Sequence, residues 1–300
     1  LDATPTNSYL KMLYKYPQAE FPYTRLVEEN RRRGANATEF ELLDTGLFDD
    51  DRYFDVFVEY AKDRPDDLLM RITAHNRGPD EARLTLLPQI CFRNTWSWTP
   101  NADRPRLWDD NGGVAIEHAR LGRFRLDFDG RPTSLFCDND TNARRLFAQP
   151  DAQGFFKDAF HEYVIDNQHA AVNPAGTGTK AAALYDLTVP AGDSVTVRLR
   201  LAPAVTSQAS PAWADFDAVL ARRQNEADEF YALLQQPIDD ADARLVQRQA
   251  FAGILWGKQF FHYDVPLWLD GDPTQPAPPP QRKHGRNADW RHLNCADVIS

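Results

Sequence analysis

Apolar and polar residues alternate along four stretches of the chain between residues 38 and 202. The apolar positions are Phe54, Val56, Val58 and Tyr60; Leu68, Met70, Ile72 and Ala74; Phe124, Leu126 and Phe128; and Val195, Val197, Leu199 and Leu201. Such alternation is typical of strands whose sheet has one buried and one solvated face. Turn-forming residues separate the stretches, at 64–67, 76–79, 111–113 and 190–193. Many antiparallel strands without intervening helices predict a β-sandwich.

The pattern changes to helical spacing after Ser210, which can cap a helix that has Pro211 at its first position. An amphipathic helix is expected from there to just before Pro237. A second helix is expected over residues 240–263, and its second half is apolar almost all round, which indicates burial by other helices. A Pro-rich stretch follows at 273–280, and with the charged residues after it predicts an extended loop.

Composition narrows the class of partner. The chain is 42% hydrophobic and 26% charged, as in globular proteins, and carries 44 acidic against 34 basic residues, a net charge of −10. This balance argues against nucleic acid or an anionic membrane as partner and is compatible with a neutral sugar. The three cysteines are widely spaced without a CxxC pair, which favours a reducing compartment, the cytoplasm.

One face of the second predicted helix carries a mixture of amides and aromatic groups: Gln249, Ala252, Trp256, Gln259 and Tyr263. Aromatic planes can stack on the CH faces of sugars while amides bond the hydroxyls. Ordinary core packing with satisfied polar tips is the alternative interpretation.

The last part of the chain places an acid, an indole, a guanidinium, an imidazole and an amide within six residues. They are Asp289, Trp290, Arg291, His292 and Asn294. Loops often carry function, although a solvated loop would have a similar composition.

Three tryptophans, Trp96, Trp98 and Trp108, flank a loop after a strand predicted at 84–93, where they could bind sugar, dock another domain or pack under the loop.

Other motifs fail on spacing. The run 138–142 begins like a calcium loop, but Ala143 stands where glycine is required and Gln149 where glutamate is required. The glycine-rich run 176–180 lacks the spacing of a phosphate loop, and the histidines include no HxxxH pair. We therefore expect neither a cofactor nor a metal ion.

Four runs carry a resemblance to a known family: TPTNSYLKMLYKYPQ at 4–18, FELLDTG at 40–46, DRYFDV at 51–56 and RNADWRHLN at 286–294. They resemble bacterial and fungal glucosidases, or mannosylglycerate-hydrolase-like glycoside hydrolases, which are similar to glycoside hydrolase family 63. The resemblance implies a β-sandwich packed on an (α/α)₆ toroid. Residues 1–205 would then form the sandwich, whose start precedes Leu1, residues 206–238 a linking helix, and residues 239–300 the beginning of the toroid.

The chemistry implied by the resemblance is hydrolysis of α-glucosides or related small glycosides with inversion. An acid and a carboxylate about 6.5–9.5 Å apart would act on opposite sides of the bond. The resemblance places both beyond Ser300, so no catalytic residue is assigned here, and Asp289 belongs to a motif that precedes the acid. The expected substrate-binding residues are Trp256, Gln259, Tyr263, Asp289, Trp290, Arg291, His292 and Asn294, and the expected partner is the remainder of the protein's own toroid. A sugar-binding or purely structural sandwich is the alternative.

Overall fold

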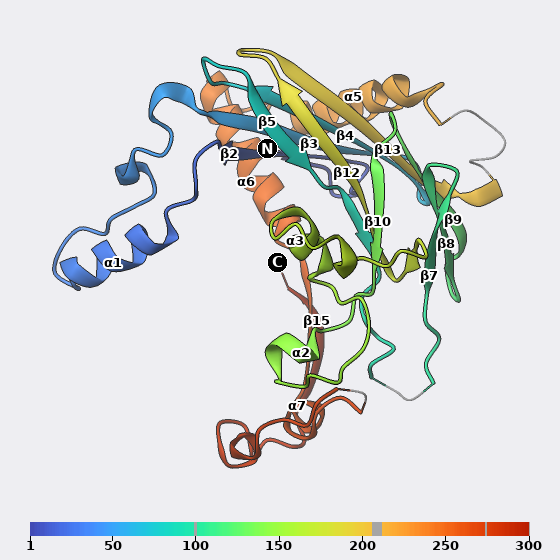
Figure 1. The fold of residues 1–300 in the computed structure, drawn as a ribbon. Helices are drawn as coiled ribbons and strands as arrows, with labels where there is room; N and C mark the ends of the chain where they lie inside the picture. Colours follow the sequence, from blue (N-terminus) through green and yellow to red (C-terminus); the bar gives the residue numbers. More distant parts are fainter. Residues whose placement is uncertain (99–100, 206–211, 274, 300) are drawn as a thin grey trace.

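The computed structural model of the protein describes residues 1–98, 101–205, 212–273 and 275–299. Its largest element is a nine-stranded antiparallel sheet in the order β1-β2-β3-β4-β13-β9-β8-β7-β11 (Figure 1). The strands are β1 (Asp2–Ala3), β2 (Tyr9–Pro17), β3 (Tyr53–Arg64), β4 (Asp67–Asn76), β7 (Arg106–Asp110), β8 (Gly113–His118), β9 (Gly122–Phe128), β11 (Thr177–Gly178) and β13 (Ser194–Pro203). The four alternating stretches of the sequence are strands β3, β4, β9 and β13, as predicted.

A second, smaller sheet packs on one face of the first. It consists of β10 (Thr133–Cys137), β12 (Lys180–Val189) and β5 (Ala82–Leu86), and β6 (Gln89–Cys91) also pairs with β12. The main core lies between the sheets, where Phe54, Ile72 and Leu199 of the large sheet meet Phe136 and Tyr185 of the small one. The predicted antiparallel β-sandwich is therefore confirmed.

The strand predicted at residues 84–93 is in fact two short strands. β5 ends at Leu86 and β6 begins at Gln89, with Pro88 between them. Proline has no amide hydrogen to donate to a ladder, so it interrupts the pairing. The carbonyl of Pro88 still accepts a hydrogen bond from the amide of Ala183.

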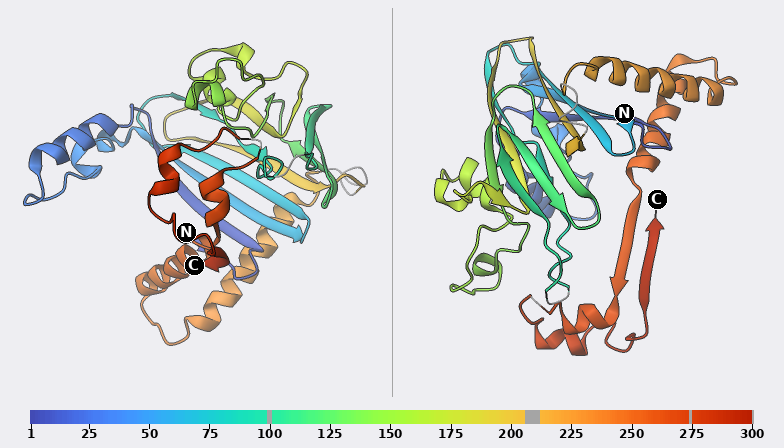
Figure 2. Two further views of the ribbon diagram at one scale, coloured as in Figure 1. Left: turned by 90° about the horizontal axis from the view of Figure 1, so that it is seen from below. Right: turned by 90° about the vertical axis from the view of Figure 1, so that its right-hand side faces the viewer.

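Helix α5 (Phe216–Leu234) lies on part of the outer face of the large sheet, on the side away from the small sheet (Figure 2, right). Phe216, Val219 and Leu220 pack on Tyr9 and Leu69 of the sheet. The helix predicted before Pro237 is therefore present, and it ends close to the predicted stop, whereas its role as a link between domains stays a prediction. The expected cap Ser210 and Pro211 lie outside the described residues.

An ion pair joins the sheet to the start of α5. Arg200 of β13 donates to both carboxylate oxygens of Asp67, at 2.9 and 2.8 Å, and to Asp215, the residue before the helix, at 2.6 Å. Asp67 is 1% exposed and Arg200 is 8% exposed. The bonds to Asp67 are the main cause that raises the pKa of Arg200, so this guanidinium stays protonated.

Several short helices lie outside the two sheets. They are α1 (Tyr23–Arg33), η1 (Leu43–Thr45), η2 (Asp49–Asp51), α2 (Ala143–Leu146), α3 (Ala159–Val164) and η3 (His169–Ala171). Helix α3 packs Phe160 against Leu135 and Cys137 on the outer face of the small sheet. Helix α1 buries none of its residues and projects from the sandwich (Figure 1). The alternation of apolar residues did not predict α1 or β2.

The second predicted helix is shorter than expected. Helix α6 spans Ala241–Trp256, with the side chain of Asp240 capping its start, and β14 (Gln259–Asp264) follows it. The prediction of a helix to residue 263 is therefore wrong beyond Trp256. Of the residues of α6 only Ala252 is buried, so the described part of this chain does not provide the expected burial.

The C-terminal part is also more ordered than predicted. It contains α7 (Val265–Asp270), η4 (Pro280–His284) and β15 (Asn294–Ile299), and β15 pairs antiparallel with β14 in a ladder that extends away from α6 (Figure 2, right). Of the cluster predicted to lie in a loop at 289–294, Asn294 is therefore the first residue of a strand. The toroid expected from residue 239 stays a prediction.

Candidate functional site

A pocket of about 790 Å³ lies between the loops of the sandwich and the C-terminal segment that runs from β14 through α7 to η4. The sandwich contributes Arg93 and Trp98, and the C-terminal segment contributes His262, Asp264 and Trp268. We call this the Trp98 pocket. It brings together residues more than 160 positions apart in the sequence, as the residue numbers show.

Aromatic and cationic groups lie next to each other where the sandwich side of the pocket meets the C-terminal segment. The rings of Trp98 and His262 lie 6.0 Å apart and are tilted by 33°. The guanidinium of Arg93 lies 5.0 Å from the Trp98 ring centroid, a cation–π contact that holds the indole in place.

The C-terminal side of the pocket has a similar pair. The guanidinium of Arg282 lies 4.9 Å from the ring of Trp268 and also donates to the carbonyl of Trp268 at 2.9 Å. Trp268 belongs to α7, whose start follows local rules: Asp264 accepts from the amide of Leu267 at 2.9 Å, and Pro266 stands in the first turn. The cap therefore fixes both the direction of α7 and the position of Trp268.

Asp264 connects α7 to the β14–β15 ladder. Besides capping the helix, its carboxylate accepts from the side chain of Asn294 at 3.0 Å, and the two residues are paired in the ladder. Asn294, predicted to bind substrate, does not line the pocket itself but is hydrogen-bonded to Asp264, which does.

The other predicted residues are dispersed. Trp256, at the end of α6, donates to the carbonyl of Asp2 at 3.1 Å and lies 6.4 Å from the Tyr60 ring, so it docks α6 on the sandwich. Gln259 and Tyr263 lie on β14, paired with Ile299 and Cys295 respectively, so no helix face joins them to Gln249, Ala252 or Trp256. The predicted common helix face is therefore wrong.

The residues predicted to act together at 289–294 have different partners in the structure. Arg291 donates to both oxygens of Asp270 at 3.0 and 3.2 Å, and these bonds hold the pKa of Asp270 below its usual range. Trp290 is 55% exposed and lies 5.7 Å from the ring of His292. Asp289 is exposed. None of the four predicted residues, which are Asp289, Trp290, Arg291 and His292, lines the Trp98 pocket.

Of the three tryptophans in the sandwich, Trp98 alone lines this pocket. Trp96 donates to Asp140 at 2.8 Å, which braces its loop, and Trp108 lies on β7 under the guanidinium of Arg106, at 5.3 Å. Asp140 also accepts from Asn94 at 2.7 Å, so the acidic run at 138–142 serves to fasten loops.

Among the described residues no cluster of histidine, cysteine or acidic side chains is arranged to hold a metal ion. Within the same residues no helix is both long enough and apolar enough to cross a membrane.

Sequence reasoning missed Arg93, His262, Asp264, Trp268 and Arg282. The signal for Asp264 and Trp268 was local: an aspartate two residues before a proline, followed by an apolar run, is a helix start. For His262 no local signal existed, because its place in the pocket depends on contact with the distant Trp98.

Comparisons with known proteins give one sequence relative of interest. No family model matches the chain. The chain is 38% identical over 347 aligned positions to the uncharacterized protein YMR196W of Saccharomyces cerevisiae, covering 100% of this chain and 32% of that protein. The chain thus spans about a third of the length of the curated relative that it matches.

Two solved structures are similar at a low level. One is a putative kojibiose phosphorylase from the human microbiome, with a TM-score of 0.29, 7% identity, and coverage of 71% of this chain and 23% of that chain. The other is the polysaccharide lyase BACCELL_00875, with a TM-score of 0.29, 12% identity, and coverage of 50% of this chain and 21% of that chain. At these scores neither likeness assigns a fold or a function.

Proposed function

We propose that this chain is part of an inverting glycoside hydrolase that acts on α-glucosides or related small glycosides. In this proposal the chain supplies the β-sandwich and one wall of the sugar pocket. The catalytic acid and carboxylate belong to an (α/α)₆ toroid that begins with α6 and continues beyond Ser300. The resemblance of the four sequence runs supplies the reaction class.

The observation that carries the proposal is the composition of the Trp98 pocket. Two indoles, Trp98 and Trp268, offer flat apolar surfaces for the CH faces of sugar rings. Asp264 and Arg282 offer an acceptor and a donor for hydroxyl groups beside them. A concave site with aromatic walls and a few fixed polar groups is the environment in which small polar ligands are held.

Exposed apolar side chains on α6 and the β14–β15 ladder support the proposed continuation of the protein. They are Leu245, Val246, Phe251, Ile254, Phe260, Phe261, Val298 and Ile299, each between 39% and 62% exposed. An apolar surface of this kind usually marks a contact with another protein surface. We assign it to the remainder of the toroid.

The test uses the longer polypeptide to which this chain belongs and 4-nitrophenyl α-glucoside as substrate. Trp98→Ala and Trp268→Ala should each lower kcat/KM by roughly ten-fold or more, because each removes an aromatic contact with the sugar. Trp108→Ala is the matched control, since Trp108 is also half-buried and stacked under an arginine, and it should leave kcat/KM nearly unchanged. NMR of the first product should show the inverted anomer.

Retention of configuration, or equal losses in all three variants, would contradict the proposal. Residues 1–300 alone should hydrolyse no nitrophenyl glycoside. Turnover by this chain would mean that the acid and the base are within it, with Asp289 and Asp297 the first carboxylates to replace.

A purely structural role for the sandwich is favoured by Trp96, whose indole nitrogen is already bonded to Asp140. Under that function the Trp98→Ala variant would lose stability and keep its turnover, which the same assay distinguishes.

A further inference from the structure

Cross-strand pairing arranges the outer face of the large sheet in rows. Tyr9, Ala61, Leu69 and Arg200 form the row under α5. The next row is Lys11, Glu59, Arg71 and Arg198, followed by Leu13, Phe57, Thr73 and Thr196, and then by Lys15, Asp55, His75 and Ser194. Because the first row is mostly apolar, the helix covers it; the polar rows beyond it remain open.

The open rows form a groove of about 520 Å³ beside the first turn of α5. We call it the sheet-face groove. Its lining residues are Lys11, Phe57, Glu59, Arg71, Thr73, His75, Asp129, Thr196, Arg198 and Asp217. It shares none of them with the Trp98 pocket.

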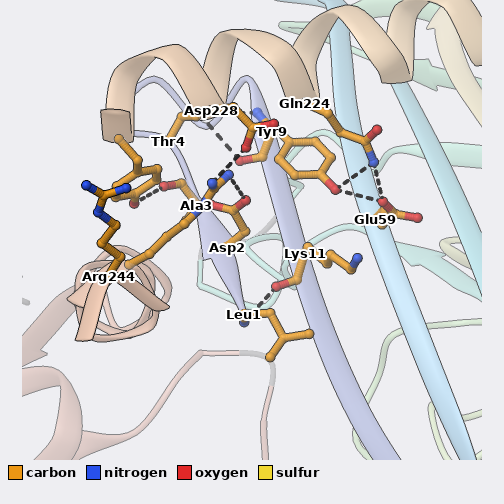
Figure 3. A network of polar contacts seen from close by, with 12 residues as sticks. Leu1, Asp2, Ala3, Thr4, Tyr9, Lys11, Glu59, Gln224, Asp228 and Arg244 are labelled. Carbon is orange, nitrogen blue, oxygen red and sulfur yellow. Dashed lines mark hydrogen bonds and ion pairs between the residues drawn. The ribbon is translucent and has the colours of Figure 1, made fainter. Parts of the chain in front are cut away.

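Four charged groups of the groove, Glu59, Arg71, Asp129 and Arg198, are held in fixed positions by hydrogen bonds and ion pairs. Glu59, 5% exposed, accepts from the hydroxyl of Tyr9 at 2.7 Å and from Gln224 of α5 at 2.8 Å (Figure 3), and it pairs with Arg71 at 2.8 Å. Arg198 pairs with Asp129 at 2.8 Å. Side chains that are already ordered lose little entropy when a ligand binds, so this surface is preorganised.

Other groups of the groove remain available to a ligand. The side chains of Lys11 and His75 make no hydrogen bond or ion pair with another described residue. The hydroxyls of Thr73 and Thr196 lie 3.1 Å apart, so they satisfy each other only in part. The half-buried ring of Phe57 is the cross-strand neighbour of Thr73 and lies 5.7 Å from the His75 ring and 5.2 Å from the Lys11 ammonium.

The charges of the groove balance. Lys11, Arg71 and Arg198 stand against Glu59, Asp129 and Asp217, three cations against three anions. An anion would approach the carboxylates and a cation the guanidinium groups, so neither is favoured. A neutral ligand with many hydroxyls can use donors, acceptors and an aromatic surface together.

We propose that the sheet-face groove binds a neutral oligosaccharide, laid across strands β2, β3, β4 and β13 with a sugar ring against Phe57. This site is separate from the Trp98 pocket and does not depend on hydrolysis. It gives the sandwich a means of holding a glycan chain.

The test is calorimetric titration of the protein with maltohexaose, cellohexaose and mannohexaose, carried out on the Trp98→Ala variant so that the pocket does not contribute. At least one probe should bind. Phe57→Ala in that background should weaken binding by roughly ten-fold, and Thr73→Val, which keeps the side-chain shape, should weaken it as well. Tyr14→Ala, which removes an exposed aromatic ring from the opposite face of β2, should leave the affinity unchanged.

Several results would overturn the inference. One is a calorimetric titration of the Trp98→Ala protein that gives no binding heat with any of the three probes. Another is equal affinity in the Phe57→Ala, Thr73→Val and parent proteins. Tighter binding of an anionic sugar, with an affinity that falls steeply as salt is added, would contradict a neutral ligand. For a neutral ligand the affinity should change by no more than roughly two-fold with salt. Loss of all binding on Trp98→Ala alone would leave the Trp98 pocket supported and refute the sheet-face groove.

Discussion

The ion pair between Arg200 and Asp67 gives a sharp test of how helix α5 is held on the sheet. Replacing Arg200 by Met leaves the carboxylate of Asp67, 1% exposed, without its two guanidinium bonds. A buried charge that loses its partner costs about 3–5 kcal/mol. The lost contact with Asp215 adds little, because that carboxylate is 51% exposed and such pairs contribute about 0–1 kcal/mol.

The measurement is urea denaturation followed by circular dichroism. Arg200→Met should lower the free energy of unfolding by about 3–5 kcal/mol, whereas Arg200→Met combined with Asp67→Leu should recover most of the loss, because no unpaired charge remains. Arg83→Met is the control: it breaks the Arg83–Asp186 pair, whose side chains are 76% and 57% exposed, and should cost no more than about 1 kcal/mol. A loss for Arg200→Met as small as that of the control, or a double variant whose loss is the sum of the single losses, would refute the reasoning.

Three further outcomes follow from the structure. Burial alone would raise the pKa of Glu59, but its hydrogen bonds outweigh burial and hold the pKa below its usual range. The stability that the Glu59 carboxylate contributes is therefore present above a pH of about 4.3 and is lost as the pH falls through the folded pKa. Denaturation curves should show that Glu59→Gln reduces this loss of stability in acid. Gly178→Ala would make a Cβ collide with the Cys137 carbonyl oxygen and should lower the free energy of unfolding by about 1–3 kcal/mol, whereas Gly253→Ala, with open space around it, should not lower it. Equal losses of unfolding free energy in the two variants would contradict this. Burial raises the pKa of the Cys137 thiol to about 12, so in the native protein Ellman's reagent should modify exposed Cys91 rapidly and Cys137 only after unfolding.

The sequence was most informative where burial and local pattern coincide. Apolar residues such as Phe54 and Val56 alternate with polar ones because one face of β3 packs on the core. The strand, and which of its faces is buried, could therefore be predicted. The start of α6 could be predicted because Asp240 is a local cap.

The predictions failed where structure depends on distant partners. Residues 259–264 are apolar enough to continue a helix, but Gly257 precedes them and the β-prone aromatic residues Phe260, Phe261 and Tyr263 pair with β15. That pairing joins two strands separated by about thirty residues, so no local sequence pattern predicts it. The contact of Trp98 with His262 is likewise a result of tertiary structure, and the candidate site could be predicted only as a chemistry of tryptophans and polar groups.

The β14–β15 ladder has a consequence for handling the protein. Within the described residues each of its two strands pairs with the other alone, so each has a free edge of amide and carbonyl groups. The exposed Phe260 and Val298 on these strands add apolar surface. Free edges of this kind accept further strands, from other molecules as readily as from the same one. When residues 1–300 are produced alone, intermolecular strand pairing should therefore begin at this ladder, and a charged residue in place of Val298 should delay aggregation.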